Sequence, residues 1–314
     1  MTVAWIIGAN GLLGSALQRT LQRRGTRLFV QVERFCWHDE AVLHRQLLTA
    51  VQAFADFAGD DNWQIYWAAG IGTMSSDQEE LATESRTLAT VLKLIESEPA
   101  LMAADGGLAF SSSAGAIYAG ASDDIITEDT AVAPTTDYAK EKLKQERLLS
   151  DFARNNNRVT VLLARISTLY GPGQADGKRQ GLLAHIARCL LGNQIVHIYV
   201  PFDTIRDYIA VDDAAFLIGE AMQVLSGKYG AFTKIIASEH STTIAEIISV
   251  FKRIARRKPR IVSSASKLTD LYTRRIQFRS ITVPIDKRRL KTSLLVGISQ
   301  VMDAERAAFI RSGR

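Results

Sequence analysis

Cysteine is scarce in this chain, with only Cys36 and Cys189 among 314 residues. Two cysteines so far apart make neither a disulfide framework nor a zinc-ligand spacing. The five histidines add no metal-ligand pattern. We therefore expect no disulfide-stapled fold, no bound metal and a reducing, cytoplasmic compartment.

Long apolar runs are missing as well, so no segment reaches the roughly 20 residues of a membrane-spanning helix. The first apolar run, Val3–Ile7, is too short for a signal peptide and lacks a basic lead-in. We find no internal repeat or low-complexity segment. With 47% hydrophobic and 23% charged residues, the chain is expected to be globular, to have no membrane partner and to divide into two lobes.

Acidic residues are nearly absent from one region near the C-terminus. Between Lys252 and Lys291 the sequence has 14 Lys or Arg and only two acids, Asp270 and Asp286, although the net charge of the whole chain is +5. Such a region suits a polyanionic ligand: nucleic acid, a membrane surface or a nucleotide diphosphate. A solvated basic face without any partner is the alternative.

The N-terminus predicts a strand, a glycine turn and a helix. Thr2–Ile7 is a continuous apolar run, typical of a strand buried on both faces, and leucines recur every four residues through Arg24. Glycines between them allow a tight turn and a close approach to a pyrophosphate at the helix N-terminus. A turn that binds nothing is the alternative. The predicted cofactor contacts here are Gly8, Asn10, Gly11, Leu12, Leu13 and Gly14.

The second predicted strand is Arg27–Val32, followed by Glu33 and Arg34. An acid at this strand end binds the adenosine ribose of NAD, whereas an arginine favours the 2′-phosphate of NADP. Both residues are therefore candidate cofactor contacts, and the choice between NAD and NADP stays open. A helix is expected near Glu40, and the crossover to the third strand looks abbreviated.

The next two strands end in small and hydroxylated residues. The strand 64–70 carries Ala68 and Ala69 at its end, which leaves room for a cofactor. After a predicted helix at 78–97, the strand from Gly107 leads to Ser111–Ser113. Parallel sheets bind ligands at the carboxyl ends of their strands.

Tyr138 and Lys142 stand four residues apart on a helix that either Thr135 or Thr136 caps. A free tyrosine has a pKa near ~10, and an ammonium one turn away lowers it. Such a tyrosine can exchange a proton with a carbinol or ketone while a nicotinamide cofactor exchanges a hydride. An ordinary lysine-rich surface helix is the alternative.

The remaining elements are expected from apolar runs and caps. They are strands at 159–164, 195–200, 234–237 and 280–285, and helices at 182–191, 212–225 and 243–256.

Together these motifs resemble the extended short-chain dehydrogenase/reductase family of nucleotide-sugar epimerases, dehydratases and ketoreductases. The similarity extends from Gly8 to about Ile298. The 25-residue step from Ser113 to Tyr138 resembles the UDP-galactose 4-epimerase branch. The other matching pieces are Ala68-Ala69, Arg165 with Tyr170-Gly171-Pro172-Gly173-Gln174, and Arg206-Asp207-Tyr208 with Val211-Asp212-Asp213.

The resemblance implies a role for each matched residue. Tyr138 would be the acid/base, and Lys142 would orient it and hold the nicotinamide ribose. Ser113, with Ser112 as the alternative, would bind the sugar hydroxyl or ketone. Arg206 would pair with the substrate diphosphate, unless it forms a structural ion pair with a neighbouring acid. Thr168 stands where the family often has an asparagine that touches substrate.

The fold expected from these motifs is α/β: a doubly wound, mainly parallel, Rossmann-like sheet with a smaller C-terminal substrate lobe. Residues 1–168 would form the NAD(P)-binding domain, to which 208–238 return, and 169–314 the substrate lobe. The expected function is epimerisation or 4-ketoreduction of a nucleotide sugar by a homodimer. Dehydration is disfavoured, because Ala114-Gly115 replaces the acidic pair of dehydratases. A non-catalytic NAD(P)-binding sensor, or a nucleic-acid-binding protein, is the alternative.

Overall fold

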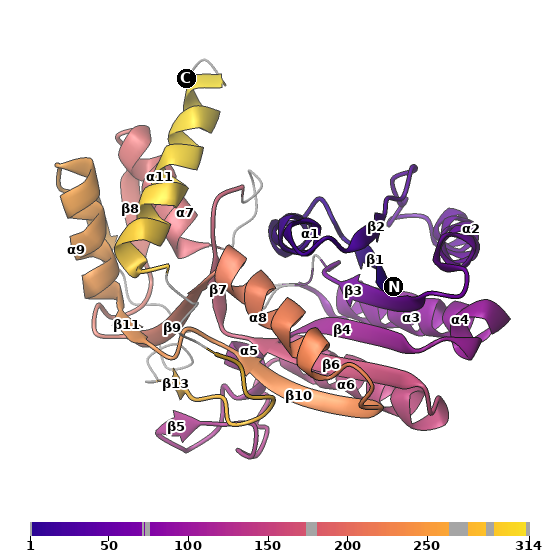
Figure 1. Ribbon diagram of the computed structural model, residues 1–314. Coiled ribbons are helices and arrows are strands. Elements are labelled where there is room, and N and C mark those ends of the chain that lie inside the picture. The colour runs from indigo at the N-terminus through magenta and orange to yellow at the C-terminus, as the bar shows by residue number, and fades with distance from the viewer. Residues whose placement is uncertain are drawn as a thin grey trace.

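The computed structural model describes residues 2–70, 72, 76–173, 181–263, 276–286 and 292–311. Its centre is a six-stranded sheet in which every neighbouring pair is parallel (Figure 1). The strand order is β10-β6-β4-β3-β1-β2. The strands are β1 (Thr2–Ile7), β2 (Arg27–Phe29), β3 (Asn62–Trp67), β4 (Gly106–Ser113), β6 (Val159–Ile166) and β10 (Gly230–Ile236).

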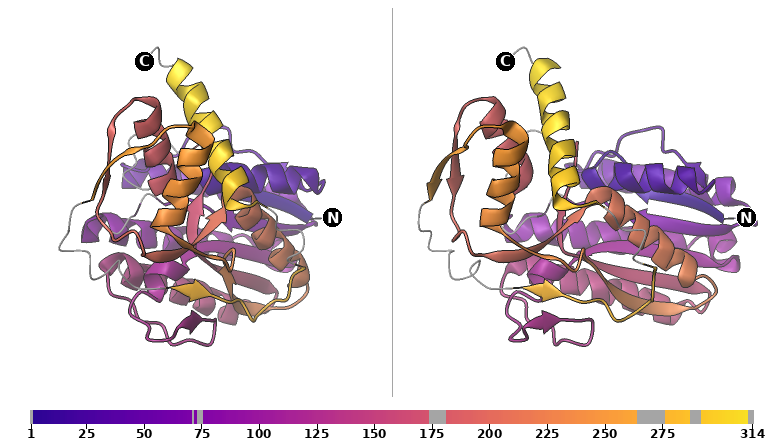
Figure 2. Two further views of the ribbon diagram at one scale, coloured as in Figure 1. Left: turned by 90° about the vertical axis from the view of Figure 1, so that its left-hand side faces the viewer. Right: turned by 60° about the vertical axis from the view of Figure 1, so that its left-hand side comes forward.

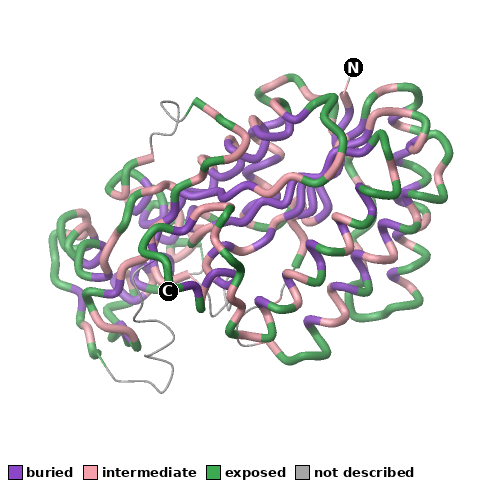
Figure 3. Tube along the Cα trace, turned by 90° about the horizontal axis from the view of Figure 1, so that it is seen from below, coloured by how far each residue is buried: buried purple, intermediate pink, exposed green. Residues whose placement is uncertain are grey.

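The sheet is buried on both faces, which explains why its strands read as continuous apolar runs. All eight residues of β6 are buried. Helices α1 (Leu12–Arg23) and α8 (Val211–Val224) pack on one face, through Leu17 and Leu217 among others. Figure 3 shows the buried strands at the centre and exposed turns on the surrounding helices. The other face packs against α2 (Glu40–Ala58), α3 (Gln78–Glu96) and α6 (Asp137–Asn155), with the short α4 (Pro99–Ala103) beside them.

Two expectations for the region after β1 are wrong. Strand β2 ends at Phe29, so Val30 and Val32 are 69% and 97% exposed. The crossover helix is not abbreviated, because α2 has 19 residues, and Asp39 caps it by accepting the Val42 N–H. Its apolar positions follow one helical face, with Leu43, Leu47 and Phe54 buried among others.

A smaller lobe is built around α7 (Leu182–Leu191), α9 (Ile244–Ala255) and α11 (Leu294–Arg311), which share one hydrophobic cluster (Figure 2). A three-stranded sheet, ordered β11-β9-β7, lies between this lobe and the main sheet, and two short strand pairs complete the fold. Residues 280–285 were expected to be a strand and are not one. The strands outside the main sheet are β5 (Ile125–Ile126), β7 (Thr168–Tyr170), β8 (Ile195–Ile198), β9 (Ile205–Ala210), β11 (Ser241–Thr243), β12 (Arg260–Ser263) and β13 (Gln277–Phe278).

The chain crosses between these two parts more than once. After β9 it returns through α8 to β10, which pairs with β6 at the edge of the main sheet. The domain bounds named above stay a prediction. Among the helices within the described ranges, none has both the length and the apolar character needed to cross a membrane.

Candidate active site

The doubly wound sheet has its switch point between β1 and β3. From β1 the chain leads to β2 on one side, and α2 then carries it back to β3 on the other side. Sheets of this kind bind ligands in the crevice beyond the carboxyl ends of such strands. The turn after β1 and the residues after β3 meet here: a Cβ on Gly8 would lie 2.6 Å from the Ala69 nitrogen and 2.8 Å from the Ala68 oxygen.

The turn after β1 requires its glycines. Gly8 has a φ of +93°, and a Cβ on Gly14 would lie 2.1 Å from the Gly8 oxygen. Gly11 is the N-cap residue of α1, and no side chain caps that helix. Free N–H groups at a helix N-terminus suit an anion. Asn10 and Gly11 are exposed while the Leu13 side chain is buried, so Leu13 can offer only backbone to a ligand. These residues fit a dinucleotide pyrophosphate.

The sequence predicted Glu33 and Arg34 at the end of the second strand, and the structure does not place them there. They lie four and five residues beyond Phe29, in an exposed segment. The reason is that the pairing of β1 with β2 stops at Trp5 and Phe29. The structure therefore gives no preference between an acid and an arginine at the adenosine ribose, and the two residues stay predicted contacts.

Ser113 and Tyr138 are brought together, as expected. Ser113 is the last residue of β4, and Tyr138 lies in the first turn of α6, which Thr136 caps by accepting the Ala139 N–H. A hydrogen bond joins the Ser113 and Tyr138 side chains. A strand end and a helix start therefore place two hydroxyls side by side at the ligand-binding edge of the sheet.

Lys142 is almost completely buried, one turn further along α6, and its Nζ lies 5.8 Å from the centre of the Tyr138 ring. It donates to Gln145 Oε1 (3.0 Å), lies 5.1 Å from the Phe110 ring and is 3.9 Å from Glu84 Oε2. Burial lowers the pKa of this ammonium, while the nearby carboxylates act to raise it. The site therefore holds a desolvated cation beside a tyrosine.

The expected lowering of the Tyr138 pKa is wrong for the protein without a ligand. Burial first, and then the Glu84 carboxylate, raise this pKa to about 12, against the opposite effect of the Ser113 hydrogen bond. The sequence predicted that the Lys142 ammonium, one turn away, would lower the Tyr138 pKa. The Glu84 carboxylate, which comes from α3, acts in the opposite direction. A phenolate would need additional positive charge to form near pH 7.

Ser112 points away from this pair, because successive residues of a strand face opposite sides. Its hydroxyl is buried and donates to Glu146 Oε1 at 2.6 Å. Arg165 binds both oxygens of Glu146, at 3.0 and 2.6 Å, and also donates to the Tyr118 hydroxyl. Of the two candidate serines, only Ser113 contacts Tyr138 among the hydrogen bonds described.

Thr168 and Arg206 lie on neighbouring strands of the three-stranded sheet, outside this group. Thr168 is exposed at the start of β7, opposite Tyr208 of β9. Arg206 is partly buried and donates to the Ile205 carbonyl. The acids near it bind other groups: Asp207 accepts from Ser167 and Ser238. Asp212 pairs with Arg19 at 2.7 Å. Gln174 of the family motif lies outside the described residues.

Sequence reasoning noted Glu84 only as a departure from the family, which usually has an asparagine near it, and gave no role to Glu84, Ser85 or Gln145. Gln145 donates to Ser85 at 3.1 Å and accepts from Lys142, and so joins α3 to α6. A signal for them was present, because both helices place polar residues on their buried stripe. In α3 the buried Leu81, Ser85 and Leu88 share one face with the partly buried Glu84, and in α6 the buried face is Lys142, Gln145, Glu146 and Leu149. Polar residues at the i, i+3, i+4 positions of an apolar face indicate a buried network.

Comparison with known proteins identifies one family: residues 4–231 match the pattern of the NAD dependent epimerase/dehydratase family. This agrees with the resemblance that the motifs indicated. No curated protein matches the chain.

Solved structures of such enzymes have the same fold. The UDP-glucose 4-epimerase of Stenotrophomonas maltophila, with bound NAD and formylated UDP-arabinopyranose, is 18% identical with a TM-score of 0.78, covering 99% of this chain and 100% of its own. The Thermotoga maritima UDP-glucose 4-epimerase with UDP-glucose is 19% identical (TM-score 0.75; 98% and 100% covered). RMD from Pseudomonas aeruginosa, complexed with NADPH, is 18% identical (TM-score 0.76; 98% and 100% covered).

Proposed function

Because the chain belongs to the NAD dependent epimerase/dehydratase family, we propose that it acts at a sugar carbon of a UDP- or dTDP-linked substrate, as a 4-epimerase or 4-ketoreductase. The observation that carries this proposal is the hydrogen-bonded pair of Ser113 and Tyr138 at the sheet edge, with the buried Lys142 one turn away. Of the three solved structures with the same fold, one contains UDP-glucose, one NADPH, and one NAD with a formylated UDP-arabinopyranose.

The residues around the switch point fit a dinucleotide. The turn Gly8–Gly14 and the start of α1 would hold its pyrophosphate, and Lys142 would bind the nicotinamide ribose. Ala68 and Ala69, directly after β3, would leave room for it to pass. NAD or NADP, when bound, supplies the hydride acceptor or donor, and an oxidised nicotinamide also supplies a positive charge.

The protein's own part is to move a proton. Oxidation of a carbinol requires its hydroxyl to lose a proton, and reduction of a ketone requires one to be added. Tyr138 would exchange that proton, with Ser113 holding the same oxygen of the sugar. Lys142 would favour the phenolate when the proton leaves. Each residue acts on the reacting oxygen or on the tyrosine itself.

Other features narrow the reaction and the substrate. Ala114 and Gly115 follow Ser113 and offer no acid to eliminate water, which disfavours dehydration. Arg206 would pair with the diphosphate, because guanidinium is a bidentate donor suited to phosphate. Thr168 and Ser112 stay predicted substrate contacts, although Ser112 also serves the buried Glu146.

We also propose that the chain forms a homodimer through α3 and α6, which pack side by side. A two-fold interface presents the same face on both subunits. The cytosolic location remains a prediction from the cysteine content.

Turnover with defined substrates tests this function. The protein is purified without added cofactor and examined by native mass spectrometry, and a retained NAD would favour the epimerase. It is then incubated with UDP-glucose, UDP-galactose or UDP-glucuronic acid, and the sugar configuration is followed by proton NMR. A reductase would instead consume NADPH with a 4-keto sugar in equal amounts. If the protein neither turns over nor binds any of these nucleotide sugars in calorimetry, the proposal is wrong.

A further inference from the structure

Glu84 brings a carboxylate into the site from a different helix than the tyrosine and lysine. It lies on α3, while Tyr138 and Lys142 lie on α6. Its Oε2 is 3.9 Å from the Lys142 ammonium, and its side chain is 15% exposed. A charge this deeply placed interacts more strongly than one at the surface.

The backbone after β3 holds this carboxylate in place. The Gly72 N–H donates to Glu84 Oε1 at 2.6 Å. A Cβ on Gly72 would lie 3.1 Å and 3.2 Å from the two carboxylate oxygens, and a Cβ on Gly70 would lie 3.4 Å from Oε2. The glycines therefore leave the space that Glu84 occupies, and a short charge-assisted hydrogen bond fixes its position.

Glu84 is also the carboxylate best placed to balance Lys142. Glu146, on the same face of α6, is bound on both oxygens by Arg165 and accepts from Ser112. Glu141 binds Lys144 at 3.0 Å on the outer side. A buried ammonium without a counter-charge is costly. Glu84 supplies that counter-charge to Lys142, because Glu146 and Glu141 are bound to other cations.

The same carboxylate acts on the tyrosine in the opposite sense to the lysine. Lys142 favours the phenolate, and Glu84 disfavours it by like-charge repulsion. Ser113 also acts on Tyr138 as a hydrogen-bond partner, and it carries no charge. Glu84 therefore adds to the effect of burial, which is the largest one, in favouring the neutral form of Tyr138.

We propose that Glu84 is a positioning residue that holds the Lys142 ammonium and, together with burial, favours the neutral, proton-donating form of Tyr138. This rests on the proposed function only in naming Tyr138 as the acid/base. A neutral tyrosine is the form that protonates a ketone, and the charge of Glu84 opposes the phenolate that oxidation of a carbinol would need.

The test replaces Glu84 by glutamine, which removes the charge and keeps an acceptor for the Gly72 N–H. Tyrosine labelled with ¹³C at Cζ reports ionisation by NMR, and Tyr138→Phe identifies the Tyr138 signal among the eight tyrosines. We expect E84Q to lower the titration midpoint of Tyr138 by about one pH unit. In active protein, the pH profile for oxidation should move toward lower pH by a similar amount.

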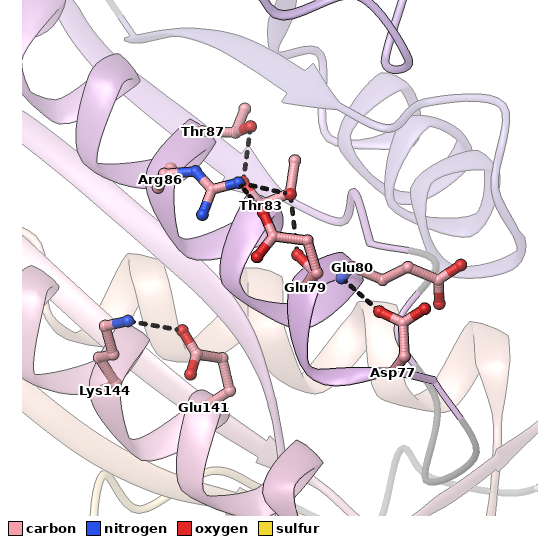
Figure 4. A network of polar contacts seen from close by, with 8 residues as sticks. All are labelled: Asp77, Glu79, Glu80, Thr83, Arg86, Thr87, Glu141 and Lys144. Carbon is pink, nitrogen blue, oxygen red and sulfur yellow. Dashed lines mark hydrogen bonds and ion pairs between the residues drawn. The ribbon is translucent and has the colours of Figure 1, made fainter.

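The matched control is Glu79→Gln, on the same helix. Glu79 is exposed and pairs with Arg86 at 2.6 Å on the outer side of α3 (Figure 4). E79Q removes the same charge and should leave the titration unchanged, while Glu84→Asp should keep most of the wild-type midpoint. An unchanged midpoint in E84Q, or an equal shift in E79Q, overturns the proposal.

The NMR measurement needs no turnover, so it separates this inference from the proposed function. If the wild-type protein is inactive on every nucleotide sugar while E84Q still shifts the Tyr138 titration, only the proposed function fails. Should E84Q not fold, Glu84→Asn takes its place in the same titration, and the absence of a shift again overturns the proposal.

Discussion

At the scale of single residues, the site depends on one hydroxyl, on a partly buried tyrosine, that does not ionise easily. Tyr138 shares a hydrogen bond with Ser113, and burial and Glu84 raise its pKa to about 12. The local sequence suggested the opposite direction, because Glu84 is 54 positions away and no local pattern connects it to the tyrosine. Burial and charges contributed by another helix decide such a pKa.

Replacing Tyr138 by phenylalanine should abolish most turnover and leave the fold intact. The change removes only the hydroxyl, so the ring still packs beside Lys142. Losing a positioned acid/base costs about 10²–10⁴-fold in rate, and we expect at least about a hundredfold loss. Steady-state kinetics measure the loss, and cofactor fluorescence provides the control for binding. Near-normal turnover would exclude Tyr138 as the acid/base.

The adjacent serines offer a matched pair. Ser112→Ala removes a buried hydrogen bond to the Glu146 carboxylate and should lower the free energy of unfolding by about 1.5–3 kcal/mol. Ser113→Ala removes the partner of Tyr138 and should lower turnover with a smaller effect on stability. Urea unfolding and kinetics on both variants give the comparison. Equal effects of the two changes on turnover would contradict the different roles.

At the scale of elements, the glycine turn shows what sequence can specify. Its glycines, the helices at 78–97 and 182–191 and the buried strands were all expected from local patterns, and the structure has them. The predicted end of β2 was wrong. Val30 and Val32 favour a strand locally, but β1 pairs with β2 only as far as Phe29. Pairing depends on the neighbouring strand, and sequence patterns describe only the strand itself.

Gly14→Ala should displace α1 from the turn. The new Cβ would lie 2.1 Å from the Gly8 oxygen, and overpacking of this kind costs about 1–3 kcal/mol. We expect a lower thermal midpoint and weaker cofactor binding by calorimetry. Gly115→Ala is the control, because no residue of the described ranges lies within 4 Å of a Cβ there. A destabilisation of the same size in both variants would refute the steric explanation.

Glu128 should make the attachment of the segment after β13 sensitive to acid. Burial acts to raise its pKa, but hydrogen bonds from Ile235, Ser280 and Ile281 outweigh burial and lower the pKa. A lowered pKa means that its stabilising effect is complete above the unfolded value, near ~4.3, and is lost as the pH falls through the folded value.

Thermal unfolding between about pH 6 and about pH 3 tests this effect. The midpoint of the wild-type protein should fall more steeply with acid than that of Glu128→Gln, which is already less stable at pH 6. Glu79→Gln, at an exposed acid, should follow the wild-type slope. Identical slopes for wild type and Glu128→Gln would argue against the role of Glu128.

At the scale of the whole molecule, the main sheet and the smaller lobe are tied together by repeated crossings of one chain. The return of 208–238 to the main sheet was expected from the family resemblance, but no local pattern indicated that β10 would pair with β6. Contacts between residues far apart in sequence leave no periodic signal.

Self-association is the prediction at this scale. A homodimer through α3 and α6 should scatter light as a particle of twice the 34.6 kDa chain at micromolar concentration. Arg86→Glu, on the outer face of α3, should weaken the dimer because the symmetric interface meets the new charge twice. A single-chain mass at that concentration would contradict the dimer.

Strand β10 is synthesised well after β6, the strand with which it pairs, and this order affects folding during synthesis. Strand β6 is buried along its whole length, and β10 covers one of its edges. About 60 residues separate the two strands, so at about 5–20 residues per second the ribosome leaves that edge uncovered for some 3–12 seconds. During this interval a nascent chain presents unpaired backbone groups of an apolar strand to any neighbour. We therefore expect the yield of this protein in cells to depend on chaperone supply.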